Sequence, residues 1–291
     1  MVKDYHMNVL AVNYENPFTD PLANENINNA VNILNVDLVK IPDKNQIHKK
    51  VFTQNAKTFF SNPDISMVPL LCTACRAVVP YEIHKIAKKN GINVIVNGGN
   101  PFEETDFKRQ LLKVSSGRAL NEKSNRYEFT KGIISKLQCS SKNIGYFKPF
   151  CIQPMIKDYL FASHLTRNRK MPFLNTIDIN FFIYIEWDEK ELLSRIKSEL
   201  NWKHPISSTW RFDCKVGVLK DFLYINSLNI TEKDNLYAKL IRESKITRDE
   251  ALKRLESENQ IDNNEILTLL RSLRYGYQDI EDLIDKLKVY Q

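Results

Sequence analysis

The sequence predicts an α/β fold: a doubly wound, mostly parallel sheet of the Rossmann-like type, followed by a helix-rich C-terminal part. Three observations support this fold class. Short apolar runs of strand length alternate with segments of helical periodicity over residues 1–115. The links between them are short, and proline or glycine marks most of their boundaries. From residue 116 onward, helical spacing dominates and strand character returns once.

The first predicted unit is a strand, a helix and a second strand. Residues 8–14 form a short apolar run that Pro17 ends, and residues 27–34 repeat apolar side chains at helical spacing. Residues 36–41 return to strand character before Pro42. Alternation of this kind is typical of parallel strands joined by a crossover helix.

Two further helices are predicted before the third strand. Residues 48–60 have helical spacing and are followed by Pro63, whereas residues 76–90 repeat the pattern and place Gly91 where a helix C-terminus needs it. The strand over residues 92–96 comes next and runs into Gly-Gly-Asn. Because ligands bind beyond the carboxyl ends of parallel strands, this turn is a candidate binding element.

The second half is predicted to be mostly helical, with a seam near residues 115–117. Residues 177–187 suggest a returning strand, Asp188 opens a helix, and Thr247 is expected to cap a further helix by accepting from the amide of Glu250. These patterns divide the chain into three parts: a core over 1–115, a helical region with the returning strand over 116–230, and a charged helical tail over 231–291.

Composition is typical of a globular protein, with 43% hydrophobic residues and no apolar run long enough to cross a membrane. The N-terminus has no apolar segment of the signal-peptide type, so we expect a cytoplasmic protein. The net charge of +7 would suit a polyanionic partner. Basic and acidic residues alternate along the chain, however, which equally fits an ordinary solvated surface.

Five cysteines are spread through the chain, and an odd, scattered set of this kind indicates free thiols in place of a disulfide framework. Cys72 and Cys75 form a Cys-x-x-Cys motif at a predicted helix start. Because structural zinc needs four ligands, this pair is half a site, and Cys214 could supply a third thiolate. Metal binding, a redox disulfide and two idle thiols all remain open.

Two groups of polar residues are candidate binding elements. Gly98, Gly99 and Asn100 follow the third strand, where glycine permits close backbone approach to a nucleotide and asparagine can offer its amide. Asn13 lies at the end of the first strand. A tight turn without a ligand explains the same residues.

A polar loop near residue 205 forms the second candidate binding group. It combines an imidazole, hydroxyl groups and a guanidinium that could hold a phosphate or a charged substrate, from His204, Ser207, Ser208 and Arg211. In the alternative reading, Ser207 or Ser208 simply caps the following helix.

The order of these segments resembles the PP-loop ATP pyrophosphatase group, also called adenine nucleotide alpha-hydrolase-like proteins. The resemblance lies in the first strand, the Cys-x-x-Cys loop and the Gly-Gly-Asn strand end. Three later stretches are most similar to the N-acetyl sugar amidotransferase branch: residues 184–191, 200–205 and 244–252.

The resemblance implies an ATP- and Mg²⁺-dependent enzyme that adenylates the acetamido oxygen of a sugar, so that ammonia from a glutaminase partner displaces AMP. It implies that Asn13, Gly98, Gly99 and Asn100 shape the nucleotide site, and that His204 and Arg211 meet the substrate. Two alternatives stay open. One is a tRNA thiolation protein with an iron–sulfur cluster on its three candidate cysteines. The other is a non-catalytic remnant that binds a nucleotide or a partner protein.

One departure from the family pattern is large. Members begin with a strand and a Ser-Gly-Gly-x-Asp-Ser loop whose amides hold the pyrophosphate of ATP, and this sequence has no such loop. Residues 1–7 resemble the last turn of the helix that follows it. We therefore expect either a truncated enzyme or a protein that has lost ATP hydrolysis, and the sequence assigns no catalytic residue.

Overall fold

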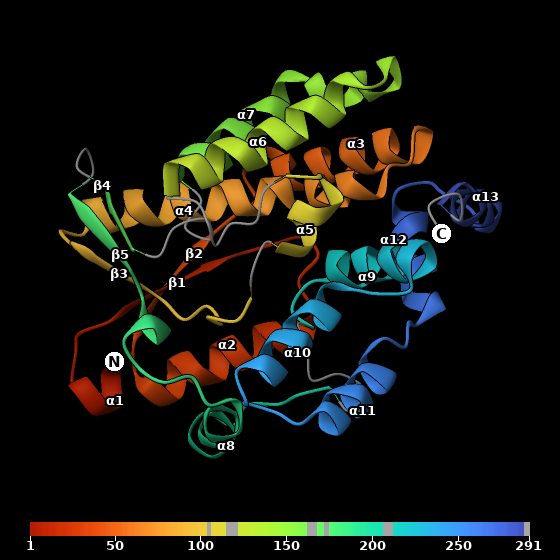
Figure 1. Ribbon diagram of the computed structural model, residues 1–291. Coiled ribbons are helices and arrows are strands. Elements are labelled where there is room, and N and C mark those ends of the chain that lie inside the picture. Colours follow the sequence, from red (N-terminus) through yellow and green to blue (C-terminus); the bar gives the residue numbers. More distant parts are fainter. Residues whose placement is uncertain (104–105, 115–121, 162–167, 172–174, 206–211, 288–291) are drawn as a thin grey trace.

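The computed structural model describes residues 1–103, 106–114, 122–161, 168–171, 175–205 and 212–287. It is a mixed α/β structure in which two small sheets lie among many helices (Figure 1). The predicted seam near residue 116 falls outside the described residues. Within the described ranges, no helix combines the length and apolar character needed to span a lipid bilayer.

The first sheet confirms the predicted strand–helix–strand unit. β1 (Leu10–Tyr14) and β2 (Asp37–Ile41) are parallel, with Leu10 opposite Asp37 and Tyr14 opposite Ile41. α2 (Pro21–Leu34) joins them. It begins where the Asp20 carboxylate accepts a hydrogen bond from the amide of Leu22 at 2.8 Å, and proline stands at its first position, as expected for a helix N-terminus.

The second sheet combines distant segments. β3 (Val94–Asn97) pairs in parallel with β5 (Thr176–Asn180), and β4 (Asn168–Met171) pairs with β5 in the antiparallel direction. Among the described residues, no ladder joins this sheet to β1 and β2. The α/β class with parallel strand pairs is thus established, whereas a single doubly wound sheet remains a prediction.

The strand predicted over residues 177–187 is too long, because β5 ends at Asn180. A 3₁₀ turn, η6 (Phe181–Ile183), follows it. The ring of Phe181 contacts those of Tyr5 and Phe182, at centroid distances of 6.5 and 5.3 Å. Neighbouring residues of a strand point to opposite faces, so the chain leaves the strand conformation where consecutive rings pack together.

Helices cover the sheets on two sides (Figure 1). α3 (Ile47–Ser61) and α4 (Thr73–Lys89) lie above them in this view, beneath α6 (Glu122–Gln138) and α7 (Pro149–Phe161), while α2 and α8 (Glu189–Leu200) lie below. Gly91 has a φ of +67°, which confirms its predicted place after α4. His84 of α4 bonds to Thr176 at 2.8 Å and attaches this helix to β5.

The main apolar core combines residues from both halves of the chain. Its centre is the 3₁₀ segment η2 (Ile65–Cys72), which packs between α3 and α9 (Lys215–Leu228). Val68 and Leu219 are fully buried there. The remaining elements are α1 (Val2–Tyr5), η1 (Lys44–Gln46), α5 (Asp106–Leu111), η4 (Ser141–Phe147), α10 (Glu232–Arg242), α11 (Arg248–Glu258), α12 (Asn263–Ser272) and α13 (Tyr277–Leu287).

Candidate functional site

The loop after β1 is tied to the start of α9. The Asn16 side-chain amide donates to the sulfur of Cys214 at 3.1 Å, and Thr19 forms a β-bridge with the same residue. The amide of Lys215 donates to the carbonyl of Phe18 at 3.0 Å. The carboxyl end of β1 and the N-terminus of α9 therefore meet, although 198 residues separate Asn16 from Cys214.

Two of the three candidate cysteines occupy helix N-termini. Cys72 is the N-cap residue of α4 and Cys214 that of α9, and neither uses its side chain for a capping hydrogen bond. Burial and the negative charge of Cys72 raise the pKa of the Cys214 thiol to about 11. Ser207 and Ser208, expected as alternative caps for this helix, lie outside the described residues, and Cys214 occupies the N-cap position because α9 begins at Lys215.

Cys75 lies in the first turn of α4 and interacts electrostatically with Tyr14. Burial, Asp43 and the charge of Cys75 all raise the pKa of Tyr14, the last residue of β1. Within the described part of the chain, no three His, Cys, Asp or Glu side chains are arranged to hold a metal ion. The thiols thus share a region without forming a recognisable metal centre.

A cluster of partly buried charges adjoins Cys72. The Glu232 carboxylate of α10 forms ion pairs with Lys108 of α5 and Lys220 of α9, each at 3.0 Å. Burial alone would raise the pKa of Glu232, but the two ammonium groups hold it far below its usual value. Burial likewise opposes the charge of Lys220, yet Glu232 and Cys72 raise its pKa overall. We call this set the thiol–lysine cluster: Cys72, Cys214, Lys220, Glu232 and Lys108.

The thiol–lysine cluster was not predicted as a unit, although both of its cysteines were candidate site residues. Lys220 and Glu232 come from the consecutive helices α9 and α10, whereas Lys108 comes from α5, more than a hundred residues earlier, and no local motif connects the three. Lys108 and Lys220 place two ammonium groups around the one carboxylate of Glu232, and the ion pair of Asp221 with Lys233 adjoins them. Lysine ammonium groups are common partners of anionic groups such as phosphates.

The turn after β3 is open. A side chain at Gly98 or Gly99 would meet no atom within 4 Å, and neither glycine has a positive φ. Asn100 accepts a hydrogen bond from the amide of Phe102 at 2.9 Å, which explains its presence as a turn residue. Asn97, at the end of β3, has a buried side-chain nitrogen without a partner among the described residues. This unpaired donor is a binding candidate that the sequence reading did not select.

The remaining predicted residues are only partly placed. Asn13 is half-buried in β1, one residue before its end. His204 is half-buried, its Nδ1 donates to the Pro205 carbonyl at 3.1 Å, and its ring lies against that of Phe212. Ser207, Ser208 and Arg211 lie outside the described residues. The structure therefore joins the cysteines to the end of β1 but does not test the polar loop as a unit.

The turn that contains Gly98 and Gly99 leads toward the cluster. It is followed by α5, which supplies Lys108, and α5 packs against η2, whose last residue is Cys72. Comparison with known proteins adds no assignment: no protein-family model matches the sequence, and no curated protein does so. The arguments for function therefore rest on the residues and their geometry.

Proposed function

We propose that the chain forms the nucleotide- and substrate-binding part of a PP-loop ATP-dependent amidotransferase that acts on an N-acetyl sugar. The observation that carries this proposal is the meeting of the β1 end with the N-terminus of α9, close to the N-terminus of α4 and to the ammonium group of Lys220. Parallel strand ends and helix N-termini favour phosphate groups. The sequence resemblance supplies the reaction class.

In the proposed reaction, the acetamido oxygen attacks the α-phosphorus of ATP and pyrophosphate leaves. Ammonia, delivered by a glutaminase partner, then adds to the activated carbon, and AMP leaves with the oxygen. Lys220 and Lys108 would stabilise the charge of the departing phosphate. The free amide nitrogen of Asn97 and the open space at Gly98 and Gly99 would fit the nucleoside part of ATP.

This function requires a phosphate loop, and the strand edges are compatible with one. Among the described strands, β1 pairs only with β2, and β3 pairs with β5. Val94 and Val96 of β3 are 42% and 40% exposed, although strands within a parallel sheet are normally buried on both faces. A further strand carrying a Ser-Gly-Gly-x-Asp-Ser loop, placed between β1 and β3, would unite both sheets into the doubly wound arrangement.

Pyrophosphate release tests the proposal. The DNA upstream of Met1 is first read for an in-frame strand and Ser-Gly-Gly-x-Asp-Ser loop, and the protein including that segment is incubated with ATP, Mg²⁺, ammonium and nucleotide-linked N-acetyl sugars. We expect sugar-dependent pyrophosphate release that Lys220→Met greatly reduces. A folded, ATP-binding protein that releases no pyrophosphate with any acetamido sugar would rule the proposal out.

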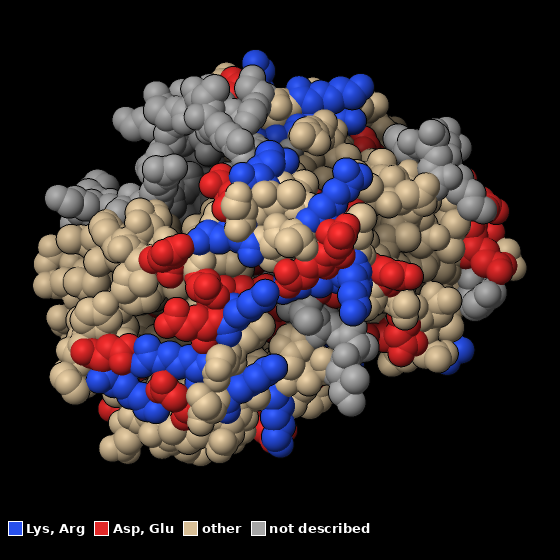
Figure 2. All heavy atoms as spheres, turned by 60° about the horizontal axis from the view of Figure 1, so that its bottom comes forward, with Lys and Arg blue, Asp and Glu red and all other residues tan. Residues whose placement is uncertain are grey.

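The neighbouring positions of Cys72 and Cys214 favour tRNA thiolation as a second candidate function. Its iron–sulfur form fits less well, because no three-ligand group occurs in the described part of the chain. On the face seen in Figure 2, basic and acidic side chains are interleaved and form no continuous basic area for RNA. Anaerobic purification tests the iron–sulfur form of tRNA thiolation against the amidotransferase proposal. A protein with an iron–sulfur cluster is brown and contains iron, whereas the amidotransferase proposal requires no cluster.

A third reading is a non-catalytic remnant that binds a nucleotide or a partner protein. It predicts AMP or ATP binding without any sugar-dependent turnover. Equilibrium binding of AMP to the chain, measured by calorimetry beside the pyrophosphate assay, separates this reading from the enzymatic ones.

A further inference from the structure

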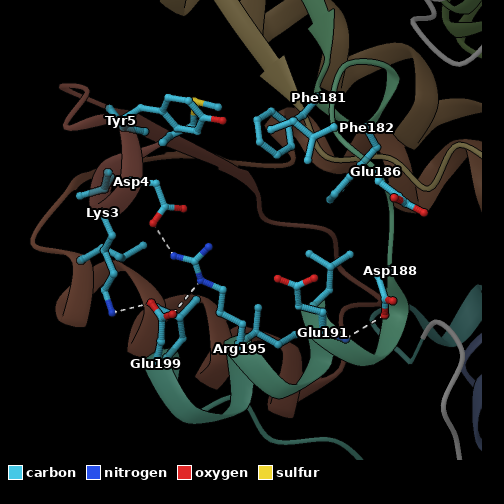
Figure 3. Close-up of a pocket in the computed structure, with 18 residues that line it drawn as sticks. Lys3, Asp4, Tyr5, Phe181, Phe182, Glu186, Asp188, Glu191, Arg195 and Glu199 are labelled. Carbon is cyan, nitrogen blue, oxygen red and sulfur yellow. Dashed lines mark hydrogen bonds and ion pairs between the residues drawn. The ribbon is translucent and has the colours of Figure 1, made fainter.

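A groove separate from the thiol–lysine cluster lies between α1, η6 and α8 (Figure 3). It has a volume of about 530 Å³. One side is apolar and includes Phe181 and Phe182, which immediately follow β5. The opposite side is α8, whose labelled charged residues lie along the groove in Figure 3.

The groove side of α8 carries two parallel rows of side chains. Leu192, Ile196 and Leu200 recur every four residues and form an apolar row. Glu191, Arg195 and Glu199 recur with the same spacing and form a charged row beside it. A helix face of this kind is suited to pack against a second helix that has both apolar and charged positions.

α1 already forms ion pairs with one end of the charged row. Lys3 pairs with Glu199 at 2.8 Å, and Asp4 pairs with Arg195 at 2.5 Å. α1 contains only four residues, Val2–Tyr5, and therefore covers little of the length of α8. Twelve residues of α8 correspond to about 18 Å of helix.

The other end of the charged row is acidic. Glu191 is exposed and its side chain points into the hollow in Figure 3. Among the described residues, no cation forms an ion pair with it. Asp188 lies beside it and accepts a hydrogen bond from the Glu191 amide at 3.0 Å. This end thus presents two carboxylates next to an apolar surface.

We propose that the groove binds an amphipathic α-helix of a partner protein, with apolar residues on one side and a lysine or arginine opposite Glu191. The occupant would extend the existing α1–α8 contact along the unpaired part of the charged row. Its basic residue would complement Glu191, as Lys3 complements Glu199. A compact small ligand fits less well, because small-molecule sites gather their polar groups around one point, whereas these are distributed along a helix.

A designed peptide pair tests the proposal. One fluorescein-labelled helical peptide carries leucines every three to four residues flanked by lysines, and its matched control has glutamates in place of the lysines. Fluorescence anisotropy measures binding of both peptides to the full chain. The protein itself has a net charge of +7, so general electrostatics oppose the lysine peptide, and preference for it would reflect a local acidic site.

Charge reversal locates the contact. We expect Glu191→Lys to weaken the lysine peptide by about three- to tenfold and to strengthen the glutamate peptide, as for exchange of one partly exposed charge pair. Glu256→Lys, an exposed position of α11 away from the groove, should change neither affinity. Circular dichroism confirms that both variants fold.

Three results would overturn the proposal. The first is absence of binding by either peptide, and the second is an equal effect of the two charge reversals. The third is Glu191-dependent binding of dodecyltrimethylammonium without binding of the lysine peptide, which would identify a site for small cationic amphiphiles. None of these results depends on pyrophosphate release.

Discussion

Lys220 of α9 and Glu232 of α10 form an ion pair of 3.0 Å beside the thiol of Cys72. The same carboxylate binds Lys108 of α5 at 3.0 Å, so one side chain connects three helices. The packing of these three helices therefore depends on Glu232, because removal of one partner from a poorly solvated ion pair is destabilising.

Glu232→Gln is expected to destabilise the protein. The substitution keeps the shape of the side chain but removes the carboxylate charge that pairs with Lys108 and Lys220, at a cost of about 2 kcal/mol, below the range for a fully buried pair. Urea unfolding followed by circular dichroism measures the change. Glu243→Gln, an exposed position at the end of α10, is the matched control. Equal midpoints for the two variants would contradict the assignment.

His48 is expected to make stability depend on pH. It is 1% exposed, stacks on Tyr14 with ring centroids 5.7 Å apart, and burial lowers its pKa from 6.5 to about 4. Below pH 6.5 the unfolded chain binds a proton that the folded protein excludes, so stability falls as the pH decreases toward 4. The full loss is about 3 kcal/mol.

Urea unfolding at several pH values measures the His48 contribution. A His48→Phe variant should lose that part of the pH dependence, whereas His6→Phe, at an exposed position, should keep it. If wild type and His48→Phe show the same pH profile between pH 4 and 6.5, the neutral buried imidazole is the wrong explanation.

Two glycines should respond to alanine in opposite directions. A Cβ at Gly145 would collide with the Thr58 hydroxyl and come within 2.7 Å of the Gln54 side chain, so Gly145→Ala should destabilise by about 1–3 kcal/mol. Gly217 lies inside α9 with open space around it, so Gly217→Ala should stabilise by up to about 1 kcal/mol. Thermal unfolding compares them, and a shift of the same sign in both would refute this account.

The cysteines should differ in reactivity toward iodoacetamide. Cys139 is exposed, whereas burial raises the pKa of Cys214 to about 11 and leaves little thiolate at pH 8. Mass spectrometry after brief alkylation of the folded protein should find Cys139 modified first. Denatured protein, in which both thiols are accessible, provides the control. Faster modification of Cys214 in the folded state would show that its environment activates the thiol.

Local signals correctly located helix ends in both halves of the chain. Gly91 follows α4, Asp188 caps α8, and Thr247 accepts from the amide of Glu250 at 3.2 Å. Each depends on residues within a few positions of one another, which is why pattern reading succeeds there. The strand predicted over residues 177–187 was too long because its apolar composition did not reveal that Phe181 packs on Tyr5, far away in sequence.

The amino-acid sequence by itself determined the alternation of helices and strands, the helix caps and the presence of a paired-thiol motif, because these follow from neighbouring residues. Tertiary structure alone decided that Cys214 meets the β1 end and that Glu232 gathers two lysines. Periodicity contains no information about which distant charges become partners. Those pairings arise when helices pack and buried charges must be neutralised away from water.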